Sequence, residues 1–229
     1  MRMTPWNVDN VNIMVSPPPA SAKPDRAYHH GDLRNALIEA GLAALERQDA
    51  SELSLRALAR DLGVSANAVY RHFADKDALL SALAAEGFRR FAQAQREARA
   101  VADTNPVATG LGYIHFAQRH PGLFRLMFGR FTRACESGEL QEAALAAFGQ
   151  LLEDSRSGTP ATHATDEATM LRAVARWSLV HGLSHLMLDG QLSFFGPGAA
   201  SDRFAAAVLK ASGLGSVQPL GKPSTKASS

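Results

Sequence analysis

The segment from residue 53 to residue 76 carries the side chains whose types and spacing best fit a recognisable chemistry. Arg56 and Arg71 can each present a planar guanidinium fork to the two acceptors of a guanine. Asn67 can form the matching pair of hydrogen bonds with adenine. The three side chains lie within sixteen consecutive residues of one another. This pattern indicates contacts with the base edges of a DNA duplex.

Three further residues of this segment suit phosphate contacts. Ser54 and Ser65 each precede a short helical pattern as a predicted N-cap, and the N-terminus of a helix offers backbone N–H groups to anions. Lys76 opens the next helical pattern and can reach the same phosphates. Phosphate contacts would fix the position of the duplex, and base contacts would read its sequence.

Two short helices must position these groups. The spacing predicts helices over 55–62 and about 66–72, with a turn at Gly63 that uses its left-handed backbone. The following apolar residues are expected to hold the pair down: Leu55, Leu58, Ala59, Leu62, Val64, Val69 and Phe73. Two helices of about eight residues joined by a glycine-containing turn are typical of a helix-turn-helix.

A plain helical hairpin with a solvated polar face is the alternative. Charge does not decide between the two, because residues 26–99 hold 11 Lys and Arg against 10 Asp and Glu. A basic arm over residues 23–34 could touch a minor groove, and a solvated leader explains it equally well. Geometry, rather than net charge, must therefore carry any binding of DNA.

The same segment resembles the N-terminal domain of TetR-family transcriptional regulators. The resemblance rests on Tyr28-His29-His30-Gly31-Asp32-Leu33-Arg34 before a first helix, and on Val69-Tyr70-Arg71-His72-Phe73 and Lys76-Asp77-Ala78-Leu79-Leu80. It implies phosphate contacts by Ser54, Tyr70, His72 and Lys76, and base reading by Arg56, Ala66, Asn67 and Ala68. Ala66 and Ala68 offer little hydrogen bonding, so readout would rest on Arg56, Asn67 and Arg71 together with contacts to thymine methyl groups.

The second half of the chain is also expected to be helical. Predicted helices span 106–119, 123–131, 137–154, 166–188 and 200–212, after long predicted helices from Asp32 and from about 76 to 100. The total is nine helices and no sheet, an all-α fold. The domain boundaries predicted are 1–25 for a disordered leader, 26–80 for the DNA-binding domain, 81–212 for a regulatory and dimerisation domain and 213–229 for a disordered tail.

An apolar effector pocket is expected in this second half. This half resembles a TetR subgroup with a Trp–His–Gly motif, on the pair of segments His120-Pro121-Gly122-Leu123-Phe124-Arg125-Leu126-Met127-Phe128 and Trp177-Ser178-Leu179-Val180-His181-Gly182. The resemblance implies a ligand-sensing and dimerisation domain. Candidate lining residues are Phe116, Phe124, Met127, Phe128, Trp177 and His181, although Phe and Met at helical spacing also suit an ordinary core. Candidate dimer residues are Leu171, Val174, Leu179, Leu183, Leu186, Phe204 and Val208, which could form a four-helix bundle between two subunits.

A different class of function uses the histidines of the predicted 166–188 helix. His181 and His185 are four residues apart with Asp189 a further turn on, so they could bind a metal or support an enzyme. Partly buried histidines on a packing face are the plainer interpretation. The single cysteine, Cys135, supplies no metal cluster.

Composition narrows the remaining classes. Hydrophobic residues are 46% and charged residues 20%, with a net charge of +2, which suits a globular chain. No run of residues is long and apolar enough to cross a membrane, and the apolar run at 13–15 is too short for a signal peptide. Composition thus leaves a cytoplasmic globular protein. The TetR resemblance implies, for such a chain, a homodimeric repressor, not an enzyme and with no cofactor, that binds a palindromic double-stranded operator and a small apolar effector.

Overall fold

The structure is a computed structural model that describes residues 30–102, 107–129, 138–156 and 166–213. These residues form nine α-helices and two 3-10 turns, without a strand among them, which confirms the all-α prediction. The helices are α1 (His30–Leu45), α2 (Leu55–Asp61), α3 (Ala66–Tyr70), α4 (Lys76–Ala100), α5 (Ala108–Arg119), α6 (Pro121–Phe128), α8 (Gly138–Arg156), α9 (Asp166–Leu188) and α10 (Asp202–Ala211). The 3-10 turns are η1 (Ala50–Glu52) and η2 (Ser193–Phe195).

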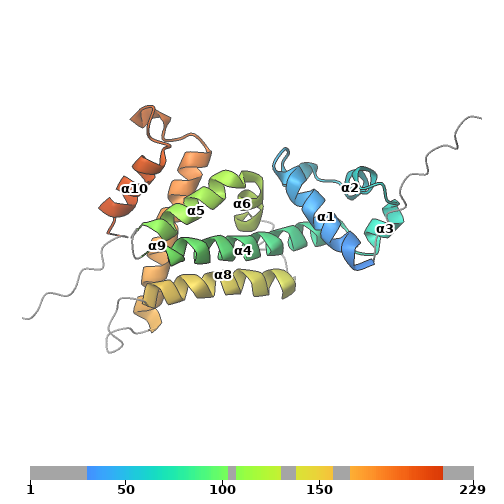
Figure 1. The fold of residues 1–229 in the computed structure, drawn as a ribbon, viewed down its shortest axis with the longest axis horizontal. Coiled ribbons are helices and arrows are strands. Elements are labelled where there is room, and N and C mark those ends of the chain that lie inside the picture. The colour runs from blue at the N-terminus through green and yellow to red at the C-terminus, as the bar shows by residue number, and fades with distance from the viewer. Residues whose placement is uncertain (1–29, 103–106, 130–137, 157–165, 214–229) are drawn as a thin grey trace, which may run out of the picture.

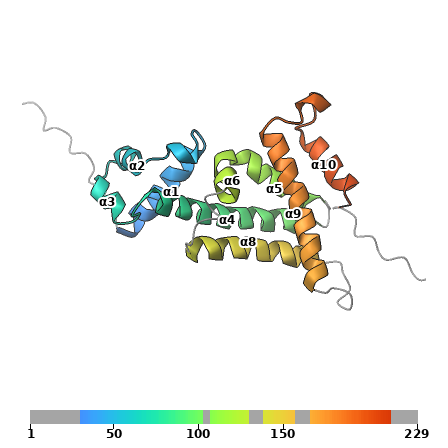
Figure 2. The same ribbon diagram turned by 180° about the vertical axis from the view of Figure 1, so that it is seen from behind.

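The long helix α4 is the axis of the molecule. The three helices α1, α2 and α3 gather at its N-terminal end, and α9 crosses its other end (Figures 1 and 2). Helix α8 runs alongside α4, while α5 and α6 cover another side of it and α10 packs beside α5 (Figure 1). One rigid element thus connects the two ends of an elongated molecule.

Apolar residues from both halves form one continuous core. It runs from Leu33 on α1 through Leu79 and Leu83 on α4 to Leu209 on α10. The halves meet closely where α6 begins: a Cβ added to Gly122 would lie 2.1 Å from the carbonyl oxygen of Leu45 at the end of α1. Only glycine allows this approach, so the α1–α6 contact fixes how the two halves sit.

Several predicted boundaries need correction. α1 begins at His30, two residues before the predicted start at Asp32. The His120-Pro121-Gly122 segment, expected to be a stop, instead opens α6, because proline fits the first turn of a helix, where its missing N–H is not needed. α3 ends at Tyr70, and the chain then tightens as His72 and Phe73 both donate to the Val69 carbonyl.

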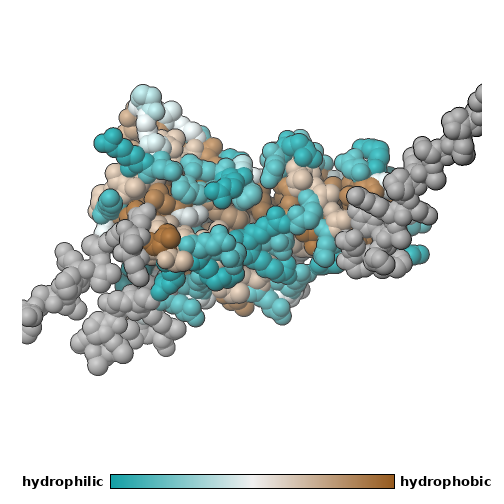
Figure 3. All heavy atoms as spheres, in the orientation of Figure 1, coloured by the Kyte–Doolittle hydropathy of each residue, from teal (hydrophilic) through white to brown (hydrophobic). Residues whose placement is uncertain are grey.

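The molecular surface mixes hydrophilic and apolar regions. Figure 3 shows hydrophilic side chains across the middle of one face and apolar atoms reaching the surface near the end where α9 crosses. Within the part of the chain that the structure describes, no helix combines the length and apolar character needed to cross a membrane.

Candidate functional site

Both short helices of the predicted helix-turn-helix carry the serine caps that the sequence indicated. The Ser54 hydroxyl accepts from Ala57 N–H at 3.5 Å, and the Ser65 hydroxyl accepts from Ala68 N–H at 3.2 Å. Gly63 adopts φ of +69°, a conformation that L side chains rarely take, and so forms the turn between the helices. Serine caps and the glycine turn thus fix where α2 ends and where α3 begins.

Two buried side chains hold α3 against the rest of this unit. Val69 is 0% exposed and Phe73 is 2% exposed, and both pack into the core with Leu55 and Leu58 of α2. Val64 in the turn is half-buried against the same cluster. The apolar face predicted for this unit is therefore the face that it buries.

The opposite face presents most of the predicted DNA-contacting side chains to solvent. Exposed members are Ser54, Arg56, Ser65, Asn67, Tyr70 and Arg71, while Ala66, Ala68 and His72 are half-buried. Tyr70 keeps 43% of its surface exposed although it is aromatic. These side chains all come from α2, α3 and the residues next to them, so the structure brings the set together on one small unit.

Two cationic side chains that could serve this face already have partners. The Lys76 ammonium donates to the Ser51 carbonyl, so it ties the start of α4 to η1. The Arg34 guanidinium forms an ion pair with Glu139 of α8 at 2.7 Å and lies 5.6 Å from the centre of the Phe73 ring. Arg34 is thus committed to the interior contacts of the chain and does not belong to a free basic arm. The rest of the proposed arm, residues 23–29, lies outside the described residues.

A cavity of about 530 Å³ opens in the C-terminal half between α4, α8 and α9. This volume lies in the range of sites for small molecules. Its lining residues are Phe88, Phe91, Gln95, Tyr113, Phe128, Gln141, Ala144, Leu145, Ala147, Phe148, Gln150, Leu151, Trp177 and Val180.

Only part of the predicted lining faces this cavity. Of the six predicted residues, Phe128 and Trp177 are among the lining residues, and His181 is not. Phe116, Phe124 and Met127 are instead core residues, exposed by 3%, 0% and 1%. These three side chains lie on the sides of α5 and α6 that pack against other helices, and so they contribute to the core.

The wall residues that the prediction missed come mainly from α4 and α8. α4 contributes Phe88 and Phe91, and α8 contributes Gln141, Leu145 and Phe148 at helical spacing. No buried-face pattern marks this wall in the sequence, because Gln141 and Leu145 are exposed and Leu145 keeps 69% of its surface accessible.

A hydrogen-bonded chain connects two residues of the cavity wall to His181. The Trp177 indole N–H donates to the Tyr113 hydroxyl at 3.1 Å, and that hydroxyl lies 2.9 Å from His181 Nδ1. Burial raises the pKa of Tyr113 well above its usual range, so its hydroxyl keeps its proton and can donate it to His181. Burial, followed by the charge of His185, lowers the pKa of His181, which favours the neutral ring that accepts this bond.

His181 and His185, the candidate metal ligands, lie among aromatic rings. The rings of His181 and His185 are 4.7 Å apart, and each packs against Phe124 at 5.4 Å. Asp189, the third candidate ligand, forms an ion pair with Arg125 at 2.9 Å. Across the four described stretches, no three His, Cys, Asp or Glu side chains are grouped as a metal would need; Cys135 lies outside them.

The candidate dimer residues divide between the surface and the core. Leu171, Val174 and Leu186 of α9 are exposed by 64%, 39% and 41%, and Leu179, Phe204 and Val208 are half-buried. Leu183 is only 6% exposed and packs inside the chain's own core. Leu183 is therefore unavailable to a partner, because its side chain is buried among the chain's own core residues.

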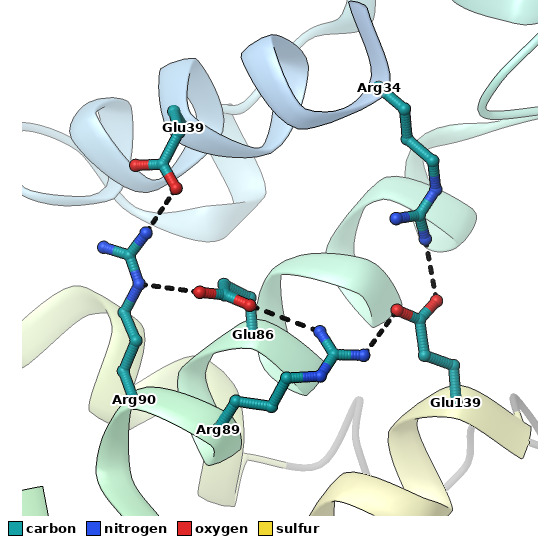
Figure 4. Close-up of polar contacts among 6 residues, drawn as sticks. All are labelled: Arg34, Glu39, Glu86, Arg89, Arg90 and Glu139. Carbon is teal, nitrogen blue, oxygen red and sulfur yellow. Dashed lines mark hydrogen bonds and ion pairs between the residues drawn. The ribbon is translucent and has the colours of Figure 1, made fainter. Parts of the chain in front are cut away.

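A ladder of alternating charges connects the two halves (Figure 4). Glu139 on α8 bonds Arg34 on α1 at 2.7 Å and Arg89 on α4 at 2.6 Å. Arg89 also pairs with Glu86 at 3.2 Å, and Glu86 pairs with Arg90 at 2.9 Å. Arg90 completes the ladder with Glu39 of α1. Hydrogen bonding to Arg89 is the main cause that lowers the pKa of Glu139, so this carboxyl stays ionised.

Comparison with known proteins places both halves in one family. The family model described as "Bacterial regulatory proteins, tetR family" matches residues 37–83, and that described as "Tetracyclin repressor-like, C-terminal domain" matches residues 107–211. The Trp–His–Gly subgroup is not among the families matched and stays a prediction.

Curated relatives and solved structures agree. An HTH-type transcriptional regulator of Mycobacterium tuberculosis (strain ATCC 25618 / H37Rv) is 33% identical over 98 residues, 41% of this chain and 42% of that protein. An uncharacterised HTH-type transcriptional regulator of Haemophilus influenzae is 30% identical over 106 residues, 44% of this chain and 52% of that protein. The chain thus spans about half or less of the curated relatives it matches.

Among solved structures, a protein of unknown function from Rhodococcus sp. RHA1 is 31% identical with a TM-score of 0.64, covering 82% of this chain and 95% of that one. A second, at 23% identity and a TM-score of 0.65, covers 80% of this chain and 95% of its own and shows the same fold. With both of its halves matched by models of one family, the chain belongs to the TetR family of bacterial regulatory proteins.

Proposed function

We propose that this chain is a DNA-binding transcriptional regulator of the cytoplasm and acts as a repressor. It binds a palindromic operator as a homodimer and leaves it when a small apolar effector enters the cavity beside α8. The observation that carries this proposal is the capped two-helix unit, whose apolar side is anchored by Val69 and Phe73 while its other side exposes Arg56, Asn67 and Arg71. Membership of the TetR family supports the same function.

In this proposal α3 enters the major groove. Arg56, Asn67 and Arg71 read base edges, and Ala66 and Ala68 let the helix backbone approach the bases. Ser54, Ser65, Tyr70 and His72 contact phosphates that fix the position of α3. Lys76 can contact a phosphate only if it gives up its hydrogen bond to the Ser51 carbonyl. If it keeps that bond, its role is to hold η1 in place beside the DNA-contacting residues.

Helix α4 provides the route by which an effector would act. Its first residues follow α3, and its later residues Phe88, Phe91 and Gln95 line the cavity. An effector that fits better when α4 tilts would change the separation of the two α3 helices in a dimer. Residues 26–80 would then act as the DNA-binding domain and 81–212 as the regulatory domain, with α4 shared between them.

The dimer is proposed to form through α9 and α10. Leu171, Val174 and Leu186 leave an apolar stripe on the outer side of α9, and Phe204 and Val208 on α10 are half-buried. Pairing of these helices in two subunits would bury the stripe in a four-helix bundle. A two-fold dimer is what a palindromic operator requires.

Selection of bound duplexes from a random DNA pool tests the proposal. We expect enrichment of an inverted repeat, and an affinity for it that falls as salt rises. Enrichment of no motif by a folded dimeric protein would contradict the proposal and leave the two-helix unit as a scaffold. In that case the His181 and His185 face would be the next candidate, tested by metal content before and after replacing both histidines with alanine.

A further inference from the structure

Within the described part of the chain, the cavity beside α8 offers no counter-ion for a charged ligand. Among the described residues that line it, none is Asp, Glu, Lys, Arg or His, and six are aromatic. An ionised group moved into such a space loses its hydration and gains no opposite charge in return. The lining therefore selects against carboxylates, sulfonates and ammonium groups.

Most polar atoms of the lining are already satisfied. Trp177 donates to Tyr113, and Tyr113 can donate to His181. The Gln95 amide can donate to the Thr109 carbonyl at 3.3 Å and accept from the Tyr113 N–H at 3.1 Å. The amides left for a ligand are those of Gln141 and Gln150, both on α8.

The aromatic rings of the wall meet each other at steep angles. Phe91 and Tyr113 are 5.0 Å apart at 81°, Phe88 and Phe128 are 5.5 Å apart at 81°, and Phe148 and Trp177 are 6.4 Å apart at 67°. Such walls present both ring faces and ring edges, the arrangement in which a further aromatic ring packs well.

We propose that this cavity takes an uncharged molecule built on an aromatic ring system, with its hydrogen-bonding group directed to the glutamines of α8. This inference rests on the proposed function in one respect: the bound molecule is an effector only if the protein regulates transcription. The chemistry of the site itself is independent of DNA.

Two fluorescent probes that share their rings and differ in charge test this inference. N-phenyl-1-naphthylamine is neutral, and 8-anilino-1-naphthalenesulfonate is the same ring system with a sulfonate. In titrations of the purified full chain we expect the neutral probe to bind at least about tenfold more tightly than the sulfonate. The difference reflects the cost of placing the sulfonate charge in the cavity without an opposite charge beside it. Equal or tighter binding of the sulfonate, or binding of neither probe, overturns the inference.

Three variants locate the binding. Ala144→Trp fills the lining and should abolish binding of the neutral probe, whereas Ala146→Trp, at an exposed α8 position outside the lining, should leave it unchanged. Leu145→Arg places a cation at a lining position that is 69% exposed and should shift the preference toward the sulfonate. If A144W binds as well as A146W, the probes sit elsewhere and the inference is wrong.

The outcome for the ligand class can be separated from the outcome for the proposed function. Displacement of the selected duplex by the neutral probe is a second, independent readout. A neutral preference without displacement supports the ligand class and counts against release by an occupant of this cavity.

A second observation, the position of Arg34, carries a separate inference about how the cavity communicates with α3. The Arg34 guanidinium lies over Phe73, the buried anchor next to α3, and at the same time bonds Glu139 at the start of α8. Helix α8 in turn supplies half of the cavity lining, including Gln141, Leu145 and Phe148. Arg34 therefore contacts both Phe73, which anchors α3, and Glu139, in the first turn of α8.

Both oxygens of Glu139 are used, one by Arg34 and the other by Arg89 of α4. A displacement of α8 must stretch one of these bonds or move α1 and α4 with it. We infer that Glu139 is a positioning residue that transmits occupancy of the cavity through Arg34 to Phe73 and α3, in addition to any tilt of α4.

The thermodynamic coupling between probe and DNA tests this inference. The dissociation constant of the neutral probe is measured with the free protein and with the protein saturated with the selected duplex. The ratio of the second constant to the first is the factor by which DNA weakens probe binding, and by linkage the probe weakens DNA binding by the same factor. We expect a ratio of about 5 or more in the wild-type protein and a ratio near one in Glu139→Gln, because the NH2 group that replaces one carboxylate oxygen donates and cannot accept from the second arginine. Probe affinity for free E139Q should stay unchanged.

Glu142→Gln is the matched control, since Glu142 is an exposed glutamate on the same helix. It should keep the wild-type ratio. Arg34→Gln should lower the ratio as E139Q does, and the double variant should lower it no further. A wild-type ratio of one, an unchanged ratio in E139Q, or additive losses in the double variant would overturn the role of Glu139.

Discussion

Side chains around α3 divide into anchors and exposed groups. Val69 and Phe73 are nearly inaccessible, whereas Tyr70 and Arg71, between them in sequence, are exposed. A turn of helix with anchors four residues apart necessarily turns the intervening residues outward. The position of each exposed group is therefore set by buried neighbours, which makes substitutions on the two sides separable.

Replacing Arg56 or Tyr70 with alanine should weaken binding to the selected duplex. Each change should cost about 1–3 kcal/mol of binding free energy, because it removes one base or phosphate contact without disturbing an anchor. Fluorescence anisotropy with the labelled duplex measures the loss. Arg96→Ala, which removes an exposed arginine of α4 far from α3, is the control for net charge. Full affinity in both R56A and Y70A would reassign these residues.

His181 should make the stability of the protein sensitive to acid. Burial and the nearby His185 lower its pKa in the folded state, so the folded state favours the neutral ring. Stability gained this way is complete above the unfolded pKa of about 6.5 and is lost as pH falls through the lower folded pKa. Protonation would also put an N–H on Nδ1, opposite the proton that Tyr113 donates.

Chemical denaturation between pH 8 and pH 5 tests this expectation. The free energy of unfolding of the wild-type protein should decline below about pH 6.5. His181→Gln should decline less steeply over the same interval, because it removes one group that resists protonation. His120, whose pKa is also lowered by burial, contributes equally to both proteins and cancels in the comparison. Parallel curves would show that His181 does not titrate on unfolding.

At the scale of the elements, Gly122 lets the start of α6 lie close against the end of α1. Gly122→Ala places a methyl group 2.1 Å from a backbone oxygen of Leu45, so α1 and α6 must separate. We expect a loss of about 1–3 kcal/mol of folding free energy, as for overpacked cores. Gly149→Ala is the matched control, since nothing lies within 4 Å of its added Cβ in α8, and it should stabilise by about 0.5–1 kcal/mol. Urea unfolding of both variants measures these changes, and equal effects would rule out the proposed clash.

The elements themselves could be predicted well from local patterns. The caps at Ser54 and Ser65 are local hydrogen bonds, so the residue types alone were enough to predict them. The extent of α9 was predicted as Asp166–Leu188, which is the observed range. The start of α6 was misjudged because Pro121 has opposite meanings at the end and at the first turn of a helix.

The cavity lining was predictable only in part, because it depends on which helix faces which. Phe124 and Phe128 lie four residues apart on α6, and one is buried core while the other lines the cavity. Periodicity groups these two residues and cannot separate them. The ion pair of Arg34 with Glu139 spans 105 positions in the sequence, so no local pattern indicates it.

At the scale of the whole molecule, the outer side of α9 is the surface best suited to a second copy of the chain. Leu171, Val174 and Leu186 are exposed there, and Gly182 on the same side has open space where a Cβ would stand. Small residues between larger apolar ones let two helices approach closely, as at many helix pairs. The proposed operator geometry depends on this surface, since only a two-fold dimer spaces two α3 helices for an inverted repeat.

Gly182→Arg and Leu171→Glu should therefore convert the protein to a monomer. G182R puts a charge within the apolar stripe of α9, and L171E puts one at its end. Pairing of two subunits would bury either charge without an opposite charge beside it. Sedimentation equilibrium measures the mass, and the affinity for the full inverted repeat should fall to that for a single half-site. Ala146→Arg, on the exposed side of α8, should leave both quantities unchanged. If G182R and L171E remain dimeric and bind the full repeat, the subunits meet elsewhere, and the half-site spacing of the selected DNA would then constrain where.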